Sequence, residues 1–150
     1  MTEIDIIQYP DKRLLEKCPT YDFMNYPEDL ANAVQMAELM RSFKHCAGLA
    51  APQIGIARRY FVMRDGIGQR FCFDPKIKGH GRDLTWAKEG SMSIKDTLVL
   101  VPRWRIIDVE FVNSRSELVK ETLKGVTARI FQHEYDYLDG KLIVLTENDR

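Results

Sequence analysis

An amphipathic pattern with the spacing of a helix extends over residues 28–44. Its apolar side chains recur every three or four positions and share one helix face: Leu30, Ala33, Val34, Ala37, Met40 and Phe43. Asn25 and Pro27 come just before the pattern, and Glu28 and Asp29 place negative charge at the positive end of the helix dipole. The sequence therefore predicts a helix over these residues.

Alternation of apolar and polar positions dominates the stretch that follows. Within residues 105–112, apolar side chains at 107, 109 and 111 alternate with acidic ones at 108 and 110, which is the period of a strand with one covered face. Residues 117–123 alternate in the same way. Short apolar runs predict further strands at residues 59–63, 71–73 and 98–101, and residues 142–145 are a candidate strand to close a sheet.

A second helix is expected over about residues 126–138. Gly125 precedes it, and Asp139 and Gly140 end it. Two helices separated by consecutive strands are typical of an α+β fold, in which helices pack against antiparallel sheets. The 150 residues contain no repeat or linker, so we expect a single domain over residues 1–150.

Composition narrows the class of protein. Lysine and arginine number 22, as do aspartate and glutamate, so the formal net charge is zero, which argues against a dedicated nucleic-acid binder. The apolar runs are too short to cross a bilayer, and the first ten residues lack the pattern of a signal peptide. Cys18, Cys46 and Cys72 form no disulfide or metal-binding spacing. We expect a cytoplasmic monomer that acts without a membrane.

Two segments before the second helix contain candidate chemistry. Residues 48–55 read Gly-Leu-Ala-Ala-Pro-Gln-Ile-Gly, whose small side chains allow close approach of a ligand. Gln53 in this segment is able to donate to an oxyanion, or alternatively to satisfy a loop carbonyl in a tight connection. Residues 89–93 read Glu-Gly-Ser-Met-Ser and lack the glycines of a serine nucleophile elbow.

A third segment lies on the second predicted helix, where residues 132–137 read Gln-His-Glu-Tyr-Asp-Tyr. A helix with two histidines four residues apart and a glutamate beside the first is a strong metal signature. His133 and Glu134 supply the first half, but Tyr137 stands where the second histidine is needed. Taken alone, the pair favours a structural histidine over a metal ligand.

In this order and spacing, the three segments resemble the motifs of the peptide deformylase family. Those motifs read Gly-x-Gly-Leu-Ala-Ala-x-Gln, Glu-Gly-Cys-Leu-Ser and Gln-His-Glu-x-Asp-His-Leu. The resemblance extends to residues 9–15, 73–75 and 101–103, and so covers nearly the whole chain. It implies a deformylase-like α+β fold, with antiparallel sheets packed around a central helix that carries His133 and Glu134.

The resemblance also implies a chemistry. Family members use a divalent metal (Fe²⁺, Zn²⁺ or Ni²⁺) to hydrolyse the formyl group from the N-terminal methionine of nascent chains. Glu134 then corresponds to the general base, and Gln53 and the main-chain amide of Met92 to the groups that stabilise the oxyanion. Glu89 and Arg103 correspond to an ion pair that braces the site. Residues expected to line the peptide-binding cleft are Ala47, Gly48, Leu49, Ile130 and Phe131.

Two of the three metal-ligand positions depart from the family pattern. His133 is retained, but Ser91 replaces the cysteine and Tyr137 the second histidine. A serine hydroxyl does not ionise as a thiol does, and a tyrosine carries its oxygen farther out and titrates at about 10. We therefore expect metal affinity to fall by several orders of magnitude, so that metal is absent or weakly bound. Other residues considered for a rebuilt site are Cys46, His45 and His80.

These departures lead to one expectation and two alternatives. We expect a deformylase homologue whose hydrolysis is lost or strongly impaired, and whose cleft still takes N-terminal methionine peptides, formylated or free. The first alternative is an active deformylase with an altered metal site. The second is a non-catalytic interaction module, for which the ribosome is a candidate partner.

Overall fold

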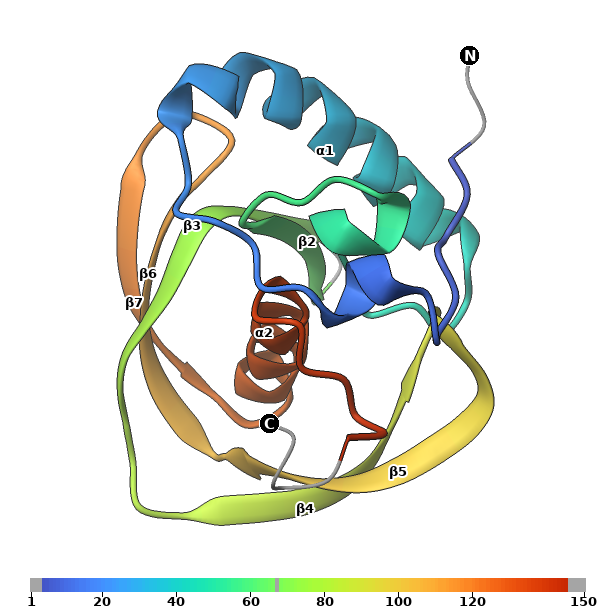
Figure 1. The fold of residues 1–150 in the computed structure, drawn as a ribbon. Helices are drawn as coiled ribbons and strands as arrows, with labels where there is room; N and C mark the ends of the chain where they lie inside the picture. Colours follow the sequence, from blue (N-terminus) through green and yellow to red (C-terminus); the bar gives the residue numbers. More distant parts are fainter. Residues whose placement is uncertain (1–3, 67, 146–150) are drawn as a thin grey trace.

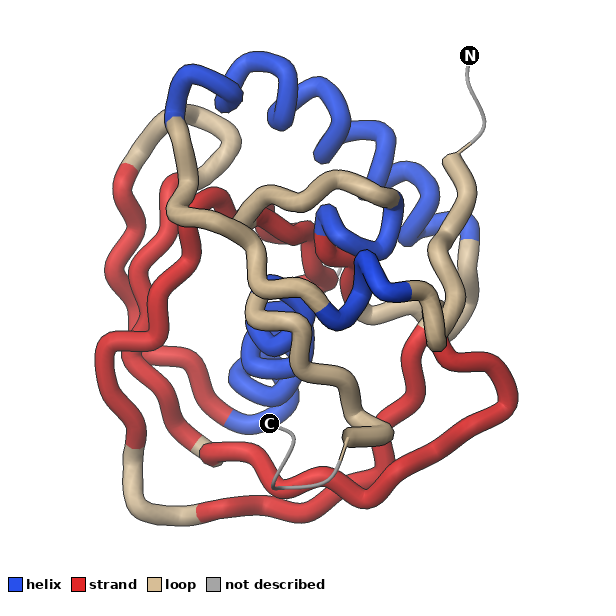
Figure 2. Tube along the Cα trace, viewed as in Figure 1, coloured by secondary structure: helices blue, strands red, loops and turns tan. Residues whose placement is uncertain are grey.

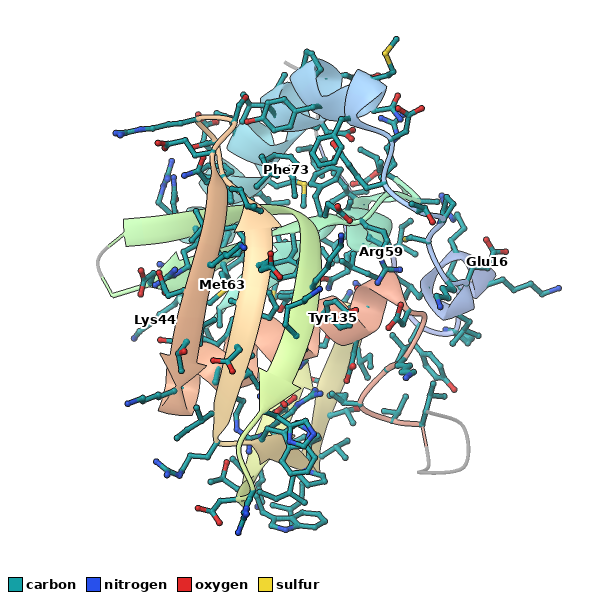
Figure 3. The ribbon with its side chains drawn as sticks, turned by 90° about the vertical axis from the view of Figure 1, so that its left-hand side faces the viewer. Glu16, Lys44, Arg59, Met63, Phe73 and Tyr135 are labelled. Carbon is teal, nitrogen blue, oxygen red and sulfur yellow. The ribbon has the colours of Figure 1, made fainter. Side chains whose placement is uncertain are left out.

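A five-stranded antiparallel sheet is the largest element of the structure, a computed structural model that describes residues 4–66 and 68–145. Its strands lie in the order β1-β2-β3-β6-β7, so β1 forms one edge. The bounds are Gly48–Ala50 for β1, Tyr60–Asp65 for β2, Gly68–His80 for β3, Ile106–Val112 for β6 and Leu118–Lys124 for β7. Figure 3 shows β3, β6 and β7 side by side, with a helix behind them.

Two further strands, β4 (Leu84–Ser91) and β5 (Ile94–Trp104), form a separate antiparallel hairpin. The pairing of Ser91 with Ile94 closes this hairpin through a two-residue connection. Figure 1 shows the hairpin and the five-stranded sheet on different sides of a helix.

That helix is α2, which spans Gly125–Leu138 and lies in the interior (Figure 1). Ala128, Phe131 and Leu138 are fully buried in its core cluster, and the Phe131 ring meets Phe61 edge-on at a centroid distance of 5.0 Å. The α2 backbone therefore has a fixed position between the hairpin and the sheet. Residues on its remaining face, among them His133, are held toward the hairpin.

The longer helix, α1 (Tyr26–Ser42), packs on the outer side of the sheet. Its fully buried Met36 and Met40 join a second core cluster with Tyr60 and Phe73 of the strands. Three short 3₁₀ helices complete the fold: η1 (Lys12–Leu15), η2 (Phe23–Asn25) and η3 (Ala51–Ile54). Within the described ranges, no helix combines the length and apolar character needed to cross a bilayer.

The predicted α+β class, with antiparallel sheets around a central helix, is confirmed. The first helix begins two residues earlier than expected, because Pro27 is tolerated within the first turn of a helix. The candidate strand at residues 142–145 is wrong, since this segment forms a turn (Figure 2). Leu142 and Ile143 are apolar because they are buried against the core, and not because they pair in a sheet.

Candidate functional site

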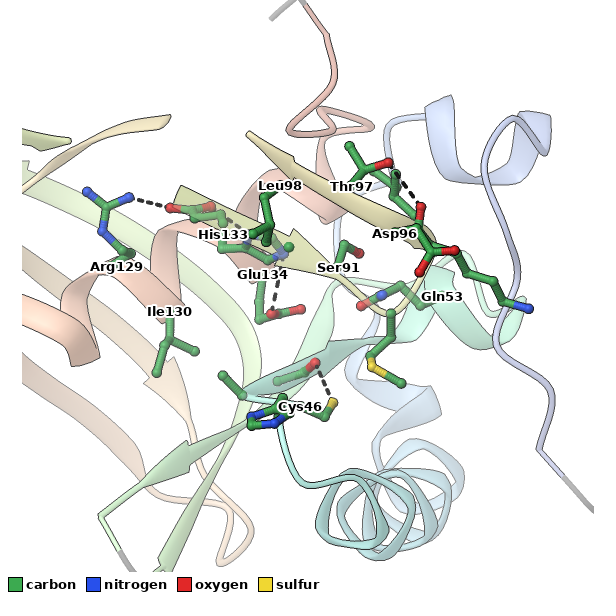
Figure 4. A pocket seen from close by; sticks show the side chains of 18 residues that line it. Cys46, Gln53, Ser91, Asp96, Thr97, Leu98, Arg129, Ile130, His133 and Glu134 are labelled. Carbon is green, nitrogen blue, oxygen red and sulfur yellow. Dashed lines mark hydrogen bonds and ion pairs between the residues drawn. The ribbon is translucent and has the colours of Figure 1, made fainter. Parts of the chain in front are cut away.

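A cavity of about 880 Å³ opens where the three motif segments meet (Figure 4). The start of β1, the β4–β5 turn and α2 each contribute part of its wall. The lining residues are 45–48, Gln53, 89–92, 94–98, Arg129, Ile130, His133 and Glu134. The fold thus brings together segments that lie more than 80 residues apart in the chain.

Gln53 connects the first segment to the hairpin. It lies in η3, where Pro52 favours the turn and Gly55 ends it with a left-handed backbone at φ 88°. Its side chain is buried: Oε1 accepts a hydrogen bond from Ala50 N at 2.9 Å, and Nε2 donates to Ser93 Oγ at 3.0 Å. The amide therefore has a fixed orientation at the cavity wall.

Ser91 and Tyr137 form a hydrogen bond between their hydroxyl groups, which joins the end of β4 to α2. The backbone N–H of Ser93 also donates to Ser91 Oγ, at 3.1 Å. Burial raises the pKa of Tyr137 well above its usual value, so its hydroxyl stays neutral. Two positions to which the family resemblance assigns metal ligands thus bind each other.

A buried cluster of charges centres on Glu89. Its carboxylate accepts from Arg103 at 2.8 and 3.0 Å and from Arg129, and it lies 2.8 Å from Nδ1 of His133. Although burial alone raises a carboxyl pKa, the hydrogen bonds from His133 and Arg103 hold the pKa of Glu89 well below its usual range. The expected Glu89–Arg103 ion pair is confirmed.

His133 is oriented by this cluster. Burial alone lowers an imidazole pKa, but the hydrogen bond with Glu89 raises the pKa of His133. With Nδ1 directed at Glu89, its Nε2 points toward the cavity and lies 3.9 Å from Oε2 of Glu134 (Figure 4).

Glu134 is the most enclosed carboxyl of the site, with 3% of its surface exposed. It packs against the backbone of Gly48, where a Cβ atom would stand only 2.8 Å from its Oε2. Within the described part of the chain, its Oε1 has no hydrogen-bond partner. Burial raises the pKa of Glu134 to about 7, against the opposing charges of His133 and Arg103. Such a group exchanges a proton near neutral pH, as general bases do.

The donor set at this site does not fit the divalent metal that the resemblance implies. Ser91 and Tyr137 offer neutral oxygens that already bind each other. Among residues 4–66 and 68–145, no group of three or more His, Cys, Asp and Glu side chains is close enough to hold a metal. Iron, zinc and nickel in proteins require imidazole, thiolate or carboxylate ligands in a defined geometry.

The three residues considered for a rebuilt site do not supply those ligands. Cys46 lines the cavity, but its thiol donates to the carbonyl of Gly48 at 3.4 Å, and burial raises its pKa to about 12. His45 lies on the exposed rim. His80 lies away from the cavity lining and stacks on Trp104 at a centroid distance of 3.7 Å.

The structure separates the expected cleft residues into two groups. Ala47, Gly48 and Ile130 line the cavity, whereas Leu49 and Phe131 do not. Met92, whose main-chain amide the resemblance assigns to the oxyanion, also lines the cavity. Leu49 follows Gly48 on a strand and so faces the opposite side, into the α1 cluster. Phe131 follows Ile130 on a helix, and its direction differs by about 100°, into the core.

Several lining residues were not anticipated from the sequence, namely Arg129, Ile94, Lys95, Asp96, Thr97 and Leu98. The position of Arg129 could have been predicted from the sequence, because Arg129 precedes His133 by four residues and so lies on the same helix face. The others belong to the start of β5 and follow directly after the second motif segment. Only the closure of the hairpin places them at the cavity.

Comparisons with known proteins agree with this geometry. The sequence model of the polypeptide deformylase family matches residues 4–149. A peptide deformylase of Thermotoga maritima is 39% identical over 120 residues, which are 79% of this chain and 73% of that protein. One from Thermotoga sp. strain RQ2 is 43% identical over 97 residues, which span 65% of this chain and 59% of that protein.

Solved structures show the same fold. The crystal structure of peptide deformylase from Thermotoga maritima superposes with a TM-score of 0.86 at 34% identity, over 96% of this chain and 97% of that one. That of a probable peptide deformylase from Synechococcus phage S-SSM7 gives 0.84 at 32% identity, over 95% and 98%. The chain therefore belongs to the polypeptide deformylase family.

Proposed function

We propose that this chain binds extended peptides with an N-terminal methionine in its cavity, and that it does so without the divalent metal of its family. The observation that carries this proposal is the hydrogen bond between Ser91 and Tyr137 beside an open cavity. The described residues supply no ligand set for metal, while a cavity of about 880 Å³ lies beside them.

The cavity walls favour a peptide with an apolar first side chain. Met92, Ile94, Leu98 and Ile130 supply apolar lining suited to a methionine side chain. Among the described strands, β1 pairs with β2 on one side, and no strand pairs with its other edge. Addition of a peptide as a strand supplies affinity through the main chain and specificity through side-chain pockets.

The retained polar residues have roles in binding under this proposal. Gln53 and Ser93 hold the wall between β1 and the hairpin. Glu89 and Arg103 fix the orientation of His133. Glu134 presents an acceptor to the N-terminal end of the peptide.

A specific observation favours a second candidate, hydrolysis by an altered site. A carboxyl with a pKa of about 7 next to a cavity is the property that a general base for water requires. This candidate predicts release of formate from formyl-Met-Ala-Ser, and loss of that release in Glu134→Ala.

Calorimetric titration of the chelator-treated protein with Met-Ala-Ser and formyl-Met-Ala-Ser tests the proposal, together with metal analysis after anaerobic purification. We expect saturable binding of at least one peptide by protein that holds far less than one equivalent of metal. One tightly held equivalent, with formate release that depends on Glu134, would establish the second candidate instead. Absence of peptide binding would overturn the proposal. Glu38→Gln, on the exposed face of α1, serves as the control variant.

A further inference from the structure

Among the described residues, the buried Oε1 of Glu134 is an acceptor without a donor, and Glu134 lines the cavity. Three buried side-chain atoms in the described residues have no hydrogen-bond partner: Tyr60 Oη, Arg70 Nε and Glu134 Oε1. Of these residues, only Glu134 lines the cavity. A buried acceptor left unsatisfied is unfavourable, so a ligand that brings a donor to this atom gains affinity.

Several donors near Glu134 are engaged elsewhere. The amide of Gln53 donates to Ser93, and the hydroxyls of Ser91 and Tyr137 bind each other. On the neighbouring turn of α2, the guanidinium of Arg129 binds Glu89 and the carbonyl of Val101 at 3.0 Å. A ligand carbonyl placed here finds Nε2 of His133 as a donor and otherwise competes with these bonds, because no metal ligand set is present among the described residues to polarise it.

We infer that the cavity selects peptides with a free α-ammonium group over N-formylated peptides, with the Glu134 carboxylate as the acceptor. The inference rests on the peptide-binding function proposed above, and it names the chemical class of the ligand. An α-ammonium group carries three donors and no acceptor. A formamide replaces these with one N–H and a carbonyl oxygen that itself needs a donor.

The position of Glu134 supports this role. The carboxyl packs against the backbone of Gly48, which leaves it little freedom to turn away from a ligand. The guanidinium groups of Arg103 and Arg129 both bind Glu89, and the charged side chain within 4 Å of the Glu134 carboxyl is His133, at 3.9 Å. At the rim, the exposed side chains of Lys95 and Asp96 carry opposite charges.

Three ligands test the inference by calorimetry at one pH: Met-Ala-Ser, formyl-Met-Ala-Ser, and an analogue of Met-Ala-Ser that lacks the α-amino group. Mass spectrometry after each titration verifies that the formyl peptide is intact. We expect Met-Ala-Ser to bind on the order of tenfold more tightly than either of the other two. Glu134→Gln keeps the size of the side chain and removes its charge, so we expect this preference to fall to about twofold or less. In Glu38→Gln, the same chemical change outside the cavity should leave the preference as in the native chain.

The outcomes separate this inference from the function on which it rests. Formyl-Met-Ala-Ser binding as tightly as Met-Ala-Ser, or more tightly, would overturn the inference and leave peptide binding in place. A preference that persists in Glu134→Gln would also overturn it. Failure of all three ligands to bind would overturn the proposed function itself. If Glu134→Gln does not fold, the comparison of the three ligands on the native chain still decides the inference.

Discussion

The hydroxyl of Tyr137 is hydrogen-bonded to the hydroxyl of Ser91, and this contact joins α2 to the end of β4 at the cavity. In deformylases a metal held by a cysteine and two histidines would link the same two elements. Here neutral groups of the chain itself make the link, and Tyr137 is only 2% exposed. The hairpin and the central helix are thus joined directly by two side chains of the protein.

A double-mutant cycle on this pair measures the link. Tyr137→Phe and Ser91→Ala each remove the hydrogen bond, and each should lower the free energy of unfolding by about 1–2 kcal/mol. The loss of unfolding free energy in the double variant should be smaller than the sum of the two single losses, because the hydrogen bond is lost only once. The difference, the coupling energy, should be about 1 kcal/mol. Urea unfolding gives these values. Strictly additive effects would show that the two hydroxyls contribute independently.

Chelators should leave the native chain unaffected. We expect the same Tm with and without EDTA, since the residues present do not form a metal site. The double variant S91C/Y137H supplies a thiol and a second imidazole one helical turn from His133, and its Tm should rise with added Ni²⁺ or Zn²⁺. Tyr137→Phe is the matched control and should not respond. A native Tm that falls on chelation would refute the metal-free account.

Gly48→Ala tests the close approach of Glu134 to β1. The new Cβ would lie 2.8 Å from Oε2 and 2.9 Å from Cδ of Glu134, so the carboxyl must move. We expect a loss of about 1–3 kcal/mol in stability and on the order of tenfold in affinity for Met-Ala-Ser. Gly79→Ala, whose Cβ would meet Asp108 Oδ2 at an ordinary 3.5 Å, should change neither appreciably. Equal effects of the two substitutions would count against this role for Gly48.

Arg103→Met should be among the most destabilising single changes at the site. It removes two hydrogen bonds to the buried Glu89 and the ion pair with Asp136 at 2.5 Å. Removal of one partner from a buried ion pair costs about 3–5 kcal/mol, because the other charge stays buried. Adding Glu89→Gln to this variant should recover part of the lost stability, measured by thermal unfolding. No recovery would mean that Arg103 acts mainly through Asp136.

The thiol of Cys46 reports on occupation of the cavity. Because burial raises its pKa to about 12, alkylation by iodoacetamide should be slow at neutral pH and accelerate about tenfold per pH unit up to that value. The direction follows because only the thiolate reacts, and its population grows as pH rises toward the pKa. Saturating Met-Ala-Ser should protect Cys46, as measured by mass spectrometry of the labelled peptide. Cys18, buried outside the cavity, should show no protection.

Much of the fold was predictable, because helices and covered strands leave regular patterns. The periodicity located both helices to within two residues, and the α+β class followed. The strand β4 was missed because its pattern is inverted. Trp86 is 59% exposed on its outer face, whereas its inner face carries Glu89 in the charged cluster. With an apolar side chain on the exposed face and a charged one on the buried face, β4 lacks the alternation that predicts a strand with one covered face.

The sequence predicted which residues belong to the site better than it predicted the contacts between them. The spacing of three segments identified Gln53, His133 and Glu134, which the fold brings to one cavity. No local pattern reveals that Ser91 and Tyr137 bind each other, since 46 residues separate them. Likewise, no local pattern reveals that Oε1 of Glu134 has no hydrogen-bond partner among the described residues, because this depends on where every donor around it lies in the fold.

Titration of metal-depleted protein with Met-Ala-Ser tests the central claim most directly. The cavity around Glu134, with the Ser91–Tyr137 hydrogen bond in place of a metal, predicts saturable binding at one site per chain. It also predicts that added Fe²⁺, Zn²⁺ or Ni²⁺ leaves the dissociation constant unchanged. Binding that appears only after a metal is restored, or no binding under either condition, would contradict the account.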